Sequence, residues 1–203
     1  MPARRILILA AALLLSACTP LIDEASSPTS AVPSGPAPTS APPQPLELEI
    51  GEFDPEGDFK VIDPCTEIPE EVYAAAGLEQ MMDGPYYDRQ LSAKCSFNAE
   101  HVNSNGLFIM TGDRVPKSRV IELEYLLEPP VQSDLDGVYF HHMGIDNSTA
   151  CSAVIHTTRG RLVVNYGESL TDTTQLANCG TALEHLERII HYLGENNGNA
   201  HRS

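Results

Sequence analysis

The sequence contains few basic residues. Its 203 residues include 12 Lys and Arg against 28 Asp and Glu, which gives a formal net charge of -16 at pH 7. This charge excludes nucleic acid as a partner, because a polyanion would be repelled, and it also opposes binding to an anionic lipid surface. The composition therefore predicts partners that are neutral, cationic or metal-bearing.

No hydrophobic run is long enough to cross a bilayer. The run from Ile6 to Leu15 has about ten residues, whereas a spanning helix needs roughly 20. It follows Arg4 and Arg5 and precedes small residues, the order typical of an export signal peptide. Leu15–Cys18 has the pattern of a lipobox, as in bacterial lipoproteins. We therefore expect residues 1–17 to be a lipoprotein signal peptide and Cys18 to be lipidated, so that the chain is anchored at the extracytoplasmic face of the cell membrane. The alternative is an ordinary secretory signal with a chance cysteine.

No C-x-x-C pair occurs, which leaves little support for a zinc ribbon or a thioredoxin-like site. Apart from Cys18 the chain has four cysteines, Cys65, Cys95, Cys151 and Cys179. An even number in an oxidising compartment predicts two disulfides, for which three connectivities are possible. Pairing of nearest neighbours would close two loops of roughly thirty residues each.

Composition divides the chain into five parts. After the signal peptide, residues 18–45 carry the lipidated cysteine and a Pro/Ser/Thr-rich tether, which can extend to roughly 80 Å as polyproline II. Residues 46–62 form an acidic lead-in, and residues 63–194 form one globular domain. Residues 195–203 are predicted to be a flexible tail.

The hydrophobic pattern predicts an α+β domain: an antiparallel sheet of about five strands with helices on one face and two disulfides. Pro69 and Gly77 bound the first helix, and a second is expected from Pro116 to Leu127. A last helix is expected from Asp172 to Gly194. The expected strands are a hairpin around 93–97 and 107–110, then a meander of 138–143, 150–157 and 161–166. Residues 81–87, which contain Gly84-Pro85, are expected to form a loop.

This element order favours one cysteine connectivity. On the last helix, Cys179 falls on an apolar stripe with Leu176, Leu183, Leu186 and Ile190. On its strand, Cys151 shares a face with Ala153 and Ile155. If that face packs on the helix, Cys151 can reach Cys179, which leaves Cys65 to pair with Cys95.

The sequence offers no convincing catalytic or metal site. His141 and His142 are adjacent on a strand and point to opposite faces, while His156 is expected near Asp136. There is no H-E-x-x-H, and the acidic run after residue 53 lacks the glycine of a calcium loop. Ser169 sits as in a nucleophile elbow, but Thr171 replaces the second glycine. We therefore expect no catalytic residue, no metal and no cofactor.

The surroundings of the cysteines resemble a known family. These are Asp63-Pro64-Cys65, Cys95-Ser96-Phe97, Cys151–Ile155 followed by Arg161–Val164, and Cys179 in the final helix. Over about residues 60–193, with the lipobox and tether, the chain is similar to an actinobacterial secreted lipoprotein family. That family is catalogued as a domain of unknown function, family thirty-five fifty-eight. The resemblance implies no activity, cofactor or catalytic residues.

Together these features predict a lipid-anchored, non-enzymatic module of the cell envelope that binds a small ligand or an envelope protein. Two alternatives remain open at this point: an envelope hydrolase with an unrecognised site, and a purely structural envelope component.

Overall fold

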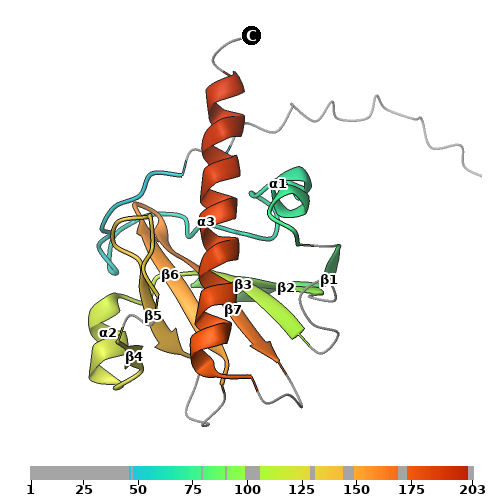
Figure 1. The fold of residues 1–203 in the computed structure, drawn as a ribbon. Coiled ribbons are helices and arrows are strands. Elements are labelled where there is room, and N and C mark those ends of the chain that lie inside the picture. The colour runs from blue at the N-terminus through green and yellow to red at the C-terminus, as the bar shows by residue number, and fades with distance from the viewer. Residues whose placement is uncertain are drawn as a thin grey trace, which may run out of the picture. The chain divides into compact units, whose positions relative to one another are not determined.

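The computed structural model describes residues 46, 48–78, 80–89, 91–98, 106–128, 131–143, 149–168 and 173–200, with side chains of the last helix as far as Gly194. Within these residues the chain forms a seven-stranded antiparallel sheet and three helices (Figure 1). The strand order across the sheet is β1-β2-β3-β7-β6-β5-β4. The predicted α+β class is confirmed, but about five strands was too few.

The strands are β1 (Met81–Asp88), β2 (Ser92–Asn98), β3 (Gly106–Asp113), β4 (Leu126–Leu127), β5 (Tyr139–His142), β6 (Cys151–Thr157) and β7 (Gly160–Glu168). The predicted hairpin is β2–β3, with Ser92 opposite Asp113 and Asn98 opposite Leu107. The predicted meander is β5–β6–β7. β7 also pairs with β3 and thereby joins the two halves of the sheet.

β1 occupies the segment that was expected to be a loop. Gly84-Pro85 suggested a turn, yet it lies within this edge strand, in a stretch where the register with β2 shifts. An edge strand tolerates proline because one row of its N–H groups has no neighbouring strand. The prediction failed because pairing with β2 overrode the local turn signal.

The first two helices are short. α1 (Glu70–Ala75) begins after Pro69 and ends just before Gly77, as predicted, and Gly77 has the positive φ of 86° that favours glycine. α2 (Lys117–Glu122) ends well before Leu127. Glu124 adopts a left-handed φ of 57°, and the chain then enters β4. The second predicted helix is therefore one short helix followed by a short edge strand.

α3 (Gln175–Ala200) starts slightly later and ends later than expected. The Thr174 hydroxyl accepts a 3.2 Å hydrogen bond from the backbone N–H of Ala177 and so caps the helix, while Asp172 lies outside the described residues. Gly194 does not end the helix. On the predicted stripe, Cys179 and Leu186 are fully buried, but Leu176 is 54% exposed.

The helices cover both faces of the sheet. α3 lies across one face, with α1 beside it, over a core that includes Phe97, Phe108, Phe140, Ala153, Ile155, Leu162 and Val164 (Figure 1). On the other face α2 packs Val120 against Tyr139, Val154 and Val163. The prediction of helices on one face is wrong for α2, because β6 and β7 are buried on both sides. We call the second face, which carries Lys94, Ile109, Thr111, Asp113 and Arg161, the open face.

One predicted disulfide is present. Cys151 on β6 bonds to Cys179 on α3, with Cα atoms 5.0 Å apart. Cys65 and Cys95 are separate thiols, close enough to hydrogen-bond; this bond, together with burial and the charge of Asp63, raises the pKa of Cys65. The second disulfide therefore stays a prediction, with its two sulfur atoms already neighbours.

Residues 48–62 pack against the domain. Ile62 is fully buried, and Ile50 makes a single antiparallel bridge to Thr157. The close approach of this segment to β3 explains Gly112, because a Cβ atom there would lie 1.9 Å from the Ile62 carbonyl oxygen. Among the described helices, none combines the length and apolar character needed to cross a membrane.

Candidate functional site

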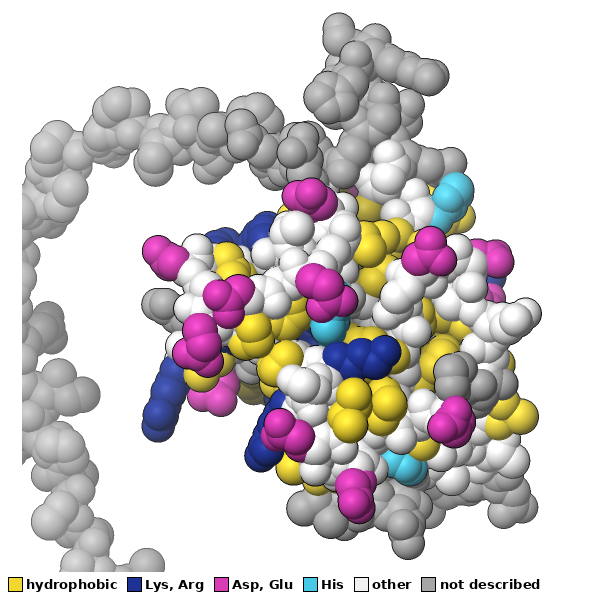
Figure 2. Space-filling model, turned by 90° about the vertical axis from the view of Figure 1, so that its left-hand side faces the viewer, with side chains coloured by type: hydrophobic (Ala, Val, Ile, Leu, Met, Phe, Trp, Pro, Cys, Tyr) yellow, Lys and Arg dark blue, Asp and Glu magenta, His cyan; other side chains and the backbone are white. Residues whose placement is uncertain are grey.

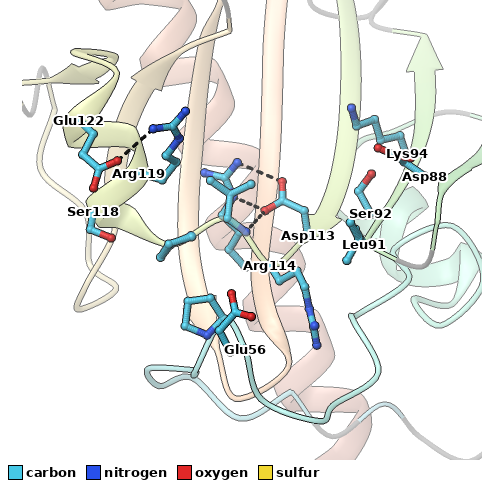
Figure 3. A pocket seen from close by; sticks show the side chains of 14 residues that line it. Glu56, Asp88, Leu91, Ser92, Lys94, Asp113, Arg114, Ser118, Arg119 and Glu122 are labelled. Atoms are coloured by element: carbon cyan, nitrogen blue, oxygen red, sulfur yellow. Dashed lines mark hydrogen bonds and ion pairs between the residues drawn. The ribbon is translucent and has the colours of Figure 1, made fainter.

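A concave site lies on the open face, between β2, the end of β3 and α2 (Figure 3). It contains a cavity of about 760 Å³, and a second cavity of about 210 Å³ lies beside it over β3, β5 and β7. Lys94, Asp113 and Arg161 line both cavities. We therefore treat them as one open-face cavity, whose volume is in the range of small-molecule sites.

A buried ion pair forms the floor of this cavity. Asp113 and Arg161 are cross-strand partners on β3 and β7, so their side chains emerge side by side. Arg161 donates to both carboxylate oxygens of Asp113, at 2.5 and 3.0 Å. Burial alone would lower the pKa of Arg161, but the hydrogen bonds and charge of Asp113 outweigh it, and the pKa is raised. The pair thus supplies a fixed dipole with no net charge.

His141 on β5 is held neutral beside this pair. Its Nε2 lies 3.3 Å from Nη1 of Arg161, and because a guanidinium can only donate, Nε2 must accept. Its Nδ1 then carries the proton and donates to the His142 carbonyl at 2.6 Å. Burial lowers the pKa of His141, and the positive charge of Arg161 adds to this. Both ring nitrogens are therefore occupied.

A row of hydrogen-bonded polar side chains crosses the open face next to the ion pair. The Ser152 hydroxyl donates to the Asn165 carbonyl oxygen at 2.6 Å. The Asn165 amide in turn donates to the Ile109 carbonyl at 2.8 Å and to the Thr111 hydroxyl at 3.3 Å. These bonds hold the polar groups in place, so the surface that they present is rigid.

Basic residues are over-represented around the larger cavity, where they balance the acidic residues in number. Four of the chain's 12 Lys and Arg residues line the larger cavity, against four of its 28 Asp and Glu residues. Elsewhere acidic side chains are spread over the surface, as on the side shown in Figure 2. In the larger cavity, Arg119 pairs with Glu122 at 3.0 Å (Figure 3). Arg114 donates to the carbonyls of Gly57 and Phe59 and pairs with no carboxylate among the described residues.

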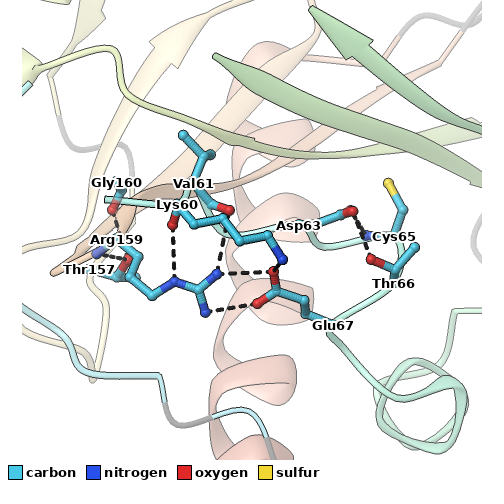
Figure 4. Close-up of polar contacts among 9 residues, drawn as sticks. All are labelled: Lys60, Val61, Asp63, Cys65, Thr66, Glu67, Thr157, Arg159 and Gly160. Atoms are coloured by element: carbon cyan, nitrogen blue, oxygen red, sulfur yellow. Dashed lines mark hydrogen bonds and ion pairs between the residues drawn. The ribbon is translucent and has the colours of Figure 1, made fainter. Parts of the chain in front are cut away.

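The lead-in segment supplies one wall of the cavity through Pro55 and Glu56. Arg159 fixes this segment from the other end: it donates to the Lys60 carbonyl at 3.1 Å and pairs with Glu67 at 2.8 Å (Figure 4). Burial would raise the pKa of Glu67, but its hydrogen bonds to Arg159 and Lys60 hold the pKa below the ordinary 4.5. The wall is therefore anchored by a charged cluster.

His156 makes a different contact from the one predicted. Its Nδ1 lies 2.9 Å from a carboxylate oxygen of Glu52, and its Nε2 lies 3.2 Å from the Tyr139 hydroxyl. The predicted contact with Asp136 is wrong, because the lead-in packs across the end of β6 and brings Glu52 to this histidine.

None of the described residues singled out as lipidation or disulfide sites lies in the open-face cavity. Cys95 and Cys151 lie on the other face of the sheet, and Cys179 lies on α3, which covers that face; Cys18 and Ser169 are outside the described residues. The sequence analysis did not identify Lys94, Asp113 or Arg161. The signal that could have found them is alternation: each is a charged strand residue that points away from the core residues of its own strand, which are Cys95 and Phe97 on β2, Phe108 and Met110 on β3, and Leu162 and Val164 on β7.

Within the described ranges, no three His, Cys, Asp or Glu side chains gather as they would to hold a metal ion. No curated protein and no solved structure matches the chain. The family described as "Protein of unknown function (DUF3558)" matches residues 13–192, and the chain therefore belongs to that family.

Proposed function

We propose that the protein is a lipid-anchored binding module of the bacterial cell envelope, which holds a ligand in the open-face cavity and has no catalytic activity. The observation that carries this proposal is the cavity itself: a rigid, concave surface with a buried ion pair on its floor and accessible charges on its walls. A rigid surface binds well because little conformational entropy is lost when a ligand arrives.

The chemistry of the cavity supports binding rather than hydrolysis. A nucleophilic mechanism needs a hydroxyl or thiol beside a base that can take its proton. Ser92 and Ser118 line the larger cavity, but in the described part of the chain neither forms a hydrogen bond to a histidine. His141 has both nitrogens engaged and so offers no lone pair to a substrate.

The anchor follows from the lipobox and remains part of the proposal. Acylated Cys18, followed by a tether that can extend to roughly 80 Å, would place the cavity clear of the lipid surface on the extracytoplasmic side. A purely structural envelope component would need the anchor and the disulfide but no cavity, and for this reason we favour a ligand-binding role.

Bound ligand in the protein from its own membrane tests the proposal. The full chain is purified in non-ionic detergent and denatured, and the small molecules released are identified by mass spectrometry. Ile109→Trp should abolish ligand recovery, because it fills the smaller cavity without adding charge. Leu107→Trp is the matched control, since Leu107 lies on the same face of the same strand but lines neither cavity. Equal recovery from all three proteins, or none from the wild type, would contradict the proposal.

A further inference from the structure

The smaller cavity has one uncompensated charge. Asp113 and Arg161 neutralise each other, and His141 is neutral because its Nε2 accepts from Arg161. The remaining titratable group in the lining is Lys94, whose ammonium group forms no hydrogen bond or ion pair within the described residues. A ligand in this cavity therefore meets a net charge of +1, carried by the exposed ammonium group of Lys94.

The rest of the lining is suited to an apolar group. Ile109 emerges from β3 on the open face and is partly buried, and Met143, which follows β5, is 40% exposed; Val163 on β7 is only 2% exposed and lies at the base of the lining. Methionine fits ligands of varied shape because its side chain is flexible and polarizable. The polar groups between these side chains, Thr111 and Asn165, are already hydrogen-bonded to each other. A ligand therefore gains mainly apolar contact here, apart from its pairing with Lys94.

We propose that the smaller part of the open-face cavity binds a free organic anion, which combines a carboxylate or phosphate head that pairs with Lys94 and a short aliphatic or aromatic body that covers Ile109 and Met143. This inference rests on the proposed binding function and adds the chemical class of the ligand.

The negative net charge of the protein does not oppose this binding. Surface charges are screened over about 8 Å at physiological ionic strength, so a ligand at Lys94 responds mainly to the groups that line the cavity. The same ammonium group disfavours a cationic ligand, because the smaller cavity offers it no uncompensated carboxylate.

Titration calorimetry of the full chain in non-ionic detergent tests the ligand class. Hexanoate and hexyl phosphate are expected to bind, acetate to bind more weakly because it lacks the apolar body, and hexylammonium not to bind. Each heat is corrected by the same titration into detergent alone. Hexylammonium binding as tightly as hexanoate, or no binding of hexanoate and hexyl phosphate, would overturn the proposal.

Variants locate the site. Lys94→Met keeps most of the aliphatic stem and should weaken hexanoate binding about two- to five-fold, because an ion pair to an exposed ammonium group contributes at most about 1 kcal/mol. Lys94→Arg should restore binding. Lys117→Met is the matched control: it removes the same charge, but Lys117 lies 4.9 Å from the centre of the Tyr139 ring and lines neither cavity. Unchanged affinity in Lys94→Met would refute the assignment.

Failure of this inference is distinguishable from failure of the proposed function. If the anionic probes do not bind, but Ile109→Trp still removes a small molecule recovered from the membrane-extracted protein, the cavity binds a ligand of another class. If both results are negative, the binding function fails as well.

Discussion

The buried pair of Arg161 and Asp113 is the most sensitive point of the open face. Arg161→Met keeps an apolar stem of similar length but removes the guanidinium, so that the carboxylate of Asp113, only 10% exposed, is left with the Val115 N–H as a donor at 2.9 Å. Removing one partner of a buried ion pair typically costs about 3–5 kcal/mol, because the other charge stays buried without its counterion. His141 also loses the donor to its Nε2.

Thermal and urea denaturation of the full chain measure this cost. For a domain of this size about 1 kcal/mol corresponds to about 2–4 °C, so the melting temperature should fall by about 6–20 °C. The double variant Arg161→Met/Asp113→Leu removes both charges of the pair, so most of the stability lost in Arg161→Met should return. Arg119→Met is the surface control, since Arg119 and Glu122 are both more than half exposed and their pair should contribute less than about 1 kcal/mol.

Two results would refute this reasoning. A loss below about 1 kcal/mol in Arg161→Met would mean that water reaches the carboxylate of Asp113 and that the pair does not form a dry floor. A double variant no more stable than Arg161→Met would mean that the loss comes from packing of the arginine stem and not from the stranded charge.

Three further predictions concern the anchor, the cysteines and the lead-in. Cys18→Ala should release the protein from the membrane fraction, and its sedimentation with membranes after a high-salt wash would contradict lipid anchoring. Peptide mapping without reduction should recover a linked Cys65–Cys95 peptide, and alkylation of both thiols before reduction would show that they stay free. Arg159→Gln should lower stability at pH 7 by about 1.5–3 kcal/mol, as measured by urea denaturation, because Glu67 loses the less exposed of its two charged partners and keeps only Lys60. Because the pKa of Glu67 is lowered in the folded protein, this group contributes stability above its unfolded-state pKa, and the contribution is lost as the pH falls through the folded-state pKa. Acidification should therefore destabilise Arg159→Gln less than the wild type. Equal acid sensitivity of the two proteins would contradict the assignment.

The parts of the fold that follow from local pattern were predictable from the sequence. Alternation placed Cys151 with Ala153 and Ile155 on one face of a strand, and helical spacing placed Cys179 on the buried stripe of α3, so their disulfide followed. α1 followed from its bounding proline and glycine in the same way. In each case the deciding interaction lies within one element or between two adjacent layers.

The failures occurred where tertiary pairing overrode a local signal. Gly84-Pro85 predicts a turn, yet pairing with β2 makes it part of an edge strand. The helical spacing after Pro116 continues to Leu127, but Glu124 turns left-handed and the last residues pair with β5. The sequence did not indicate what packs against the apolar residues that β6 and β7 present on the open face. In the structure, Val120 of α2 packs against them.

The cavity was not predictable because its residues come from segments far apart in the sequence. Lys94, Asp113 and Arg161 become neighbours through the register of β2 with β3 and of β3 with β7. A shift of one residue in either register would move a strand's set of side chains to the other face and bury Asp113 or Arg161 under α3. The register is itself set by the core on that face, where Met110 and Leu162 must point toward α3. Core packing under the helix thus positions the charged residues on the opposite face.

The same reasoning explains why the net charge alone predicts neutral or cationic partners, whereas the lining of the cavity leads us to propose an anion. A net charge of -16 describes the sum over a surface on which acidic side chains are widely spread, and a sum contains no information about position. On the open face, pairing with Arg161 neutralises Asp113, the one carboxylate that lines the smaller cavity, while Lys94 has no such partner. Because screening limits the reach of exposed charges, the lining and not the total sets the sign of the charge that a ligand encounters. A strongly acidic protein can therefore present a site whose local charge favours an anion.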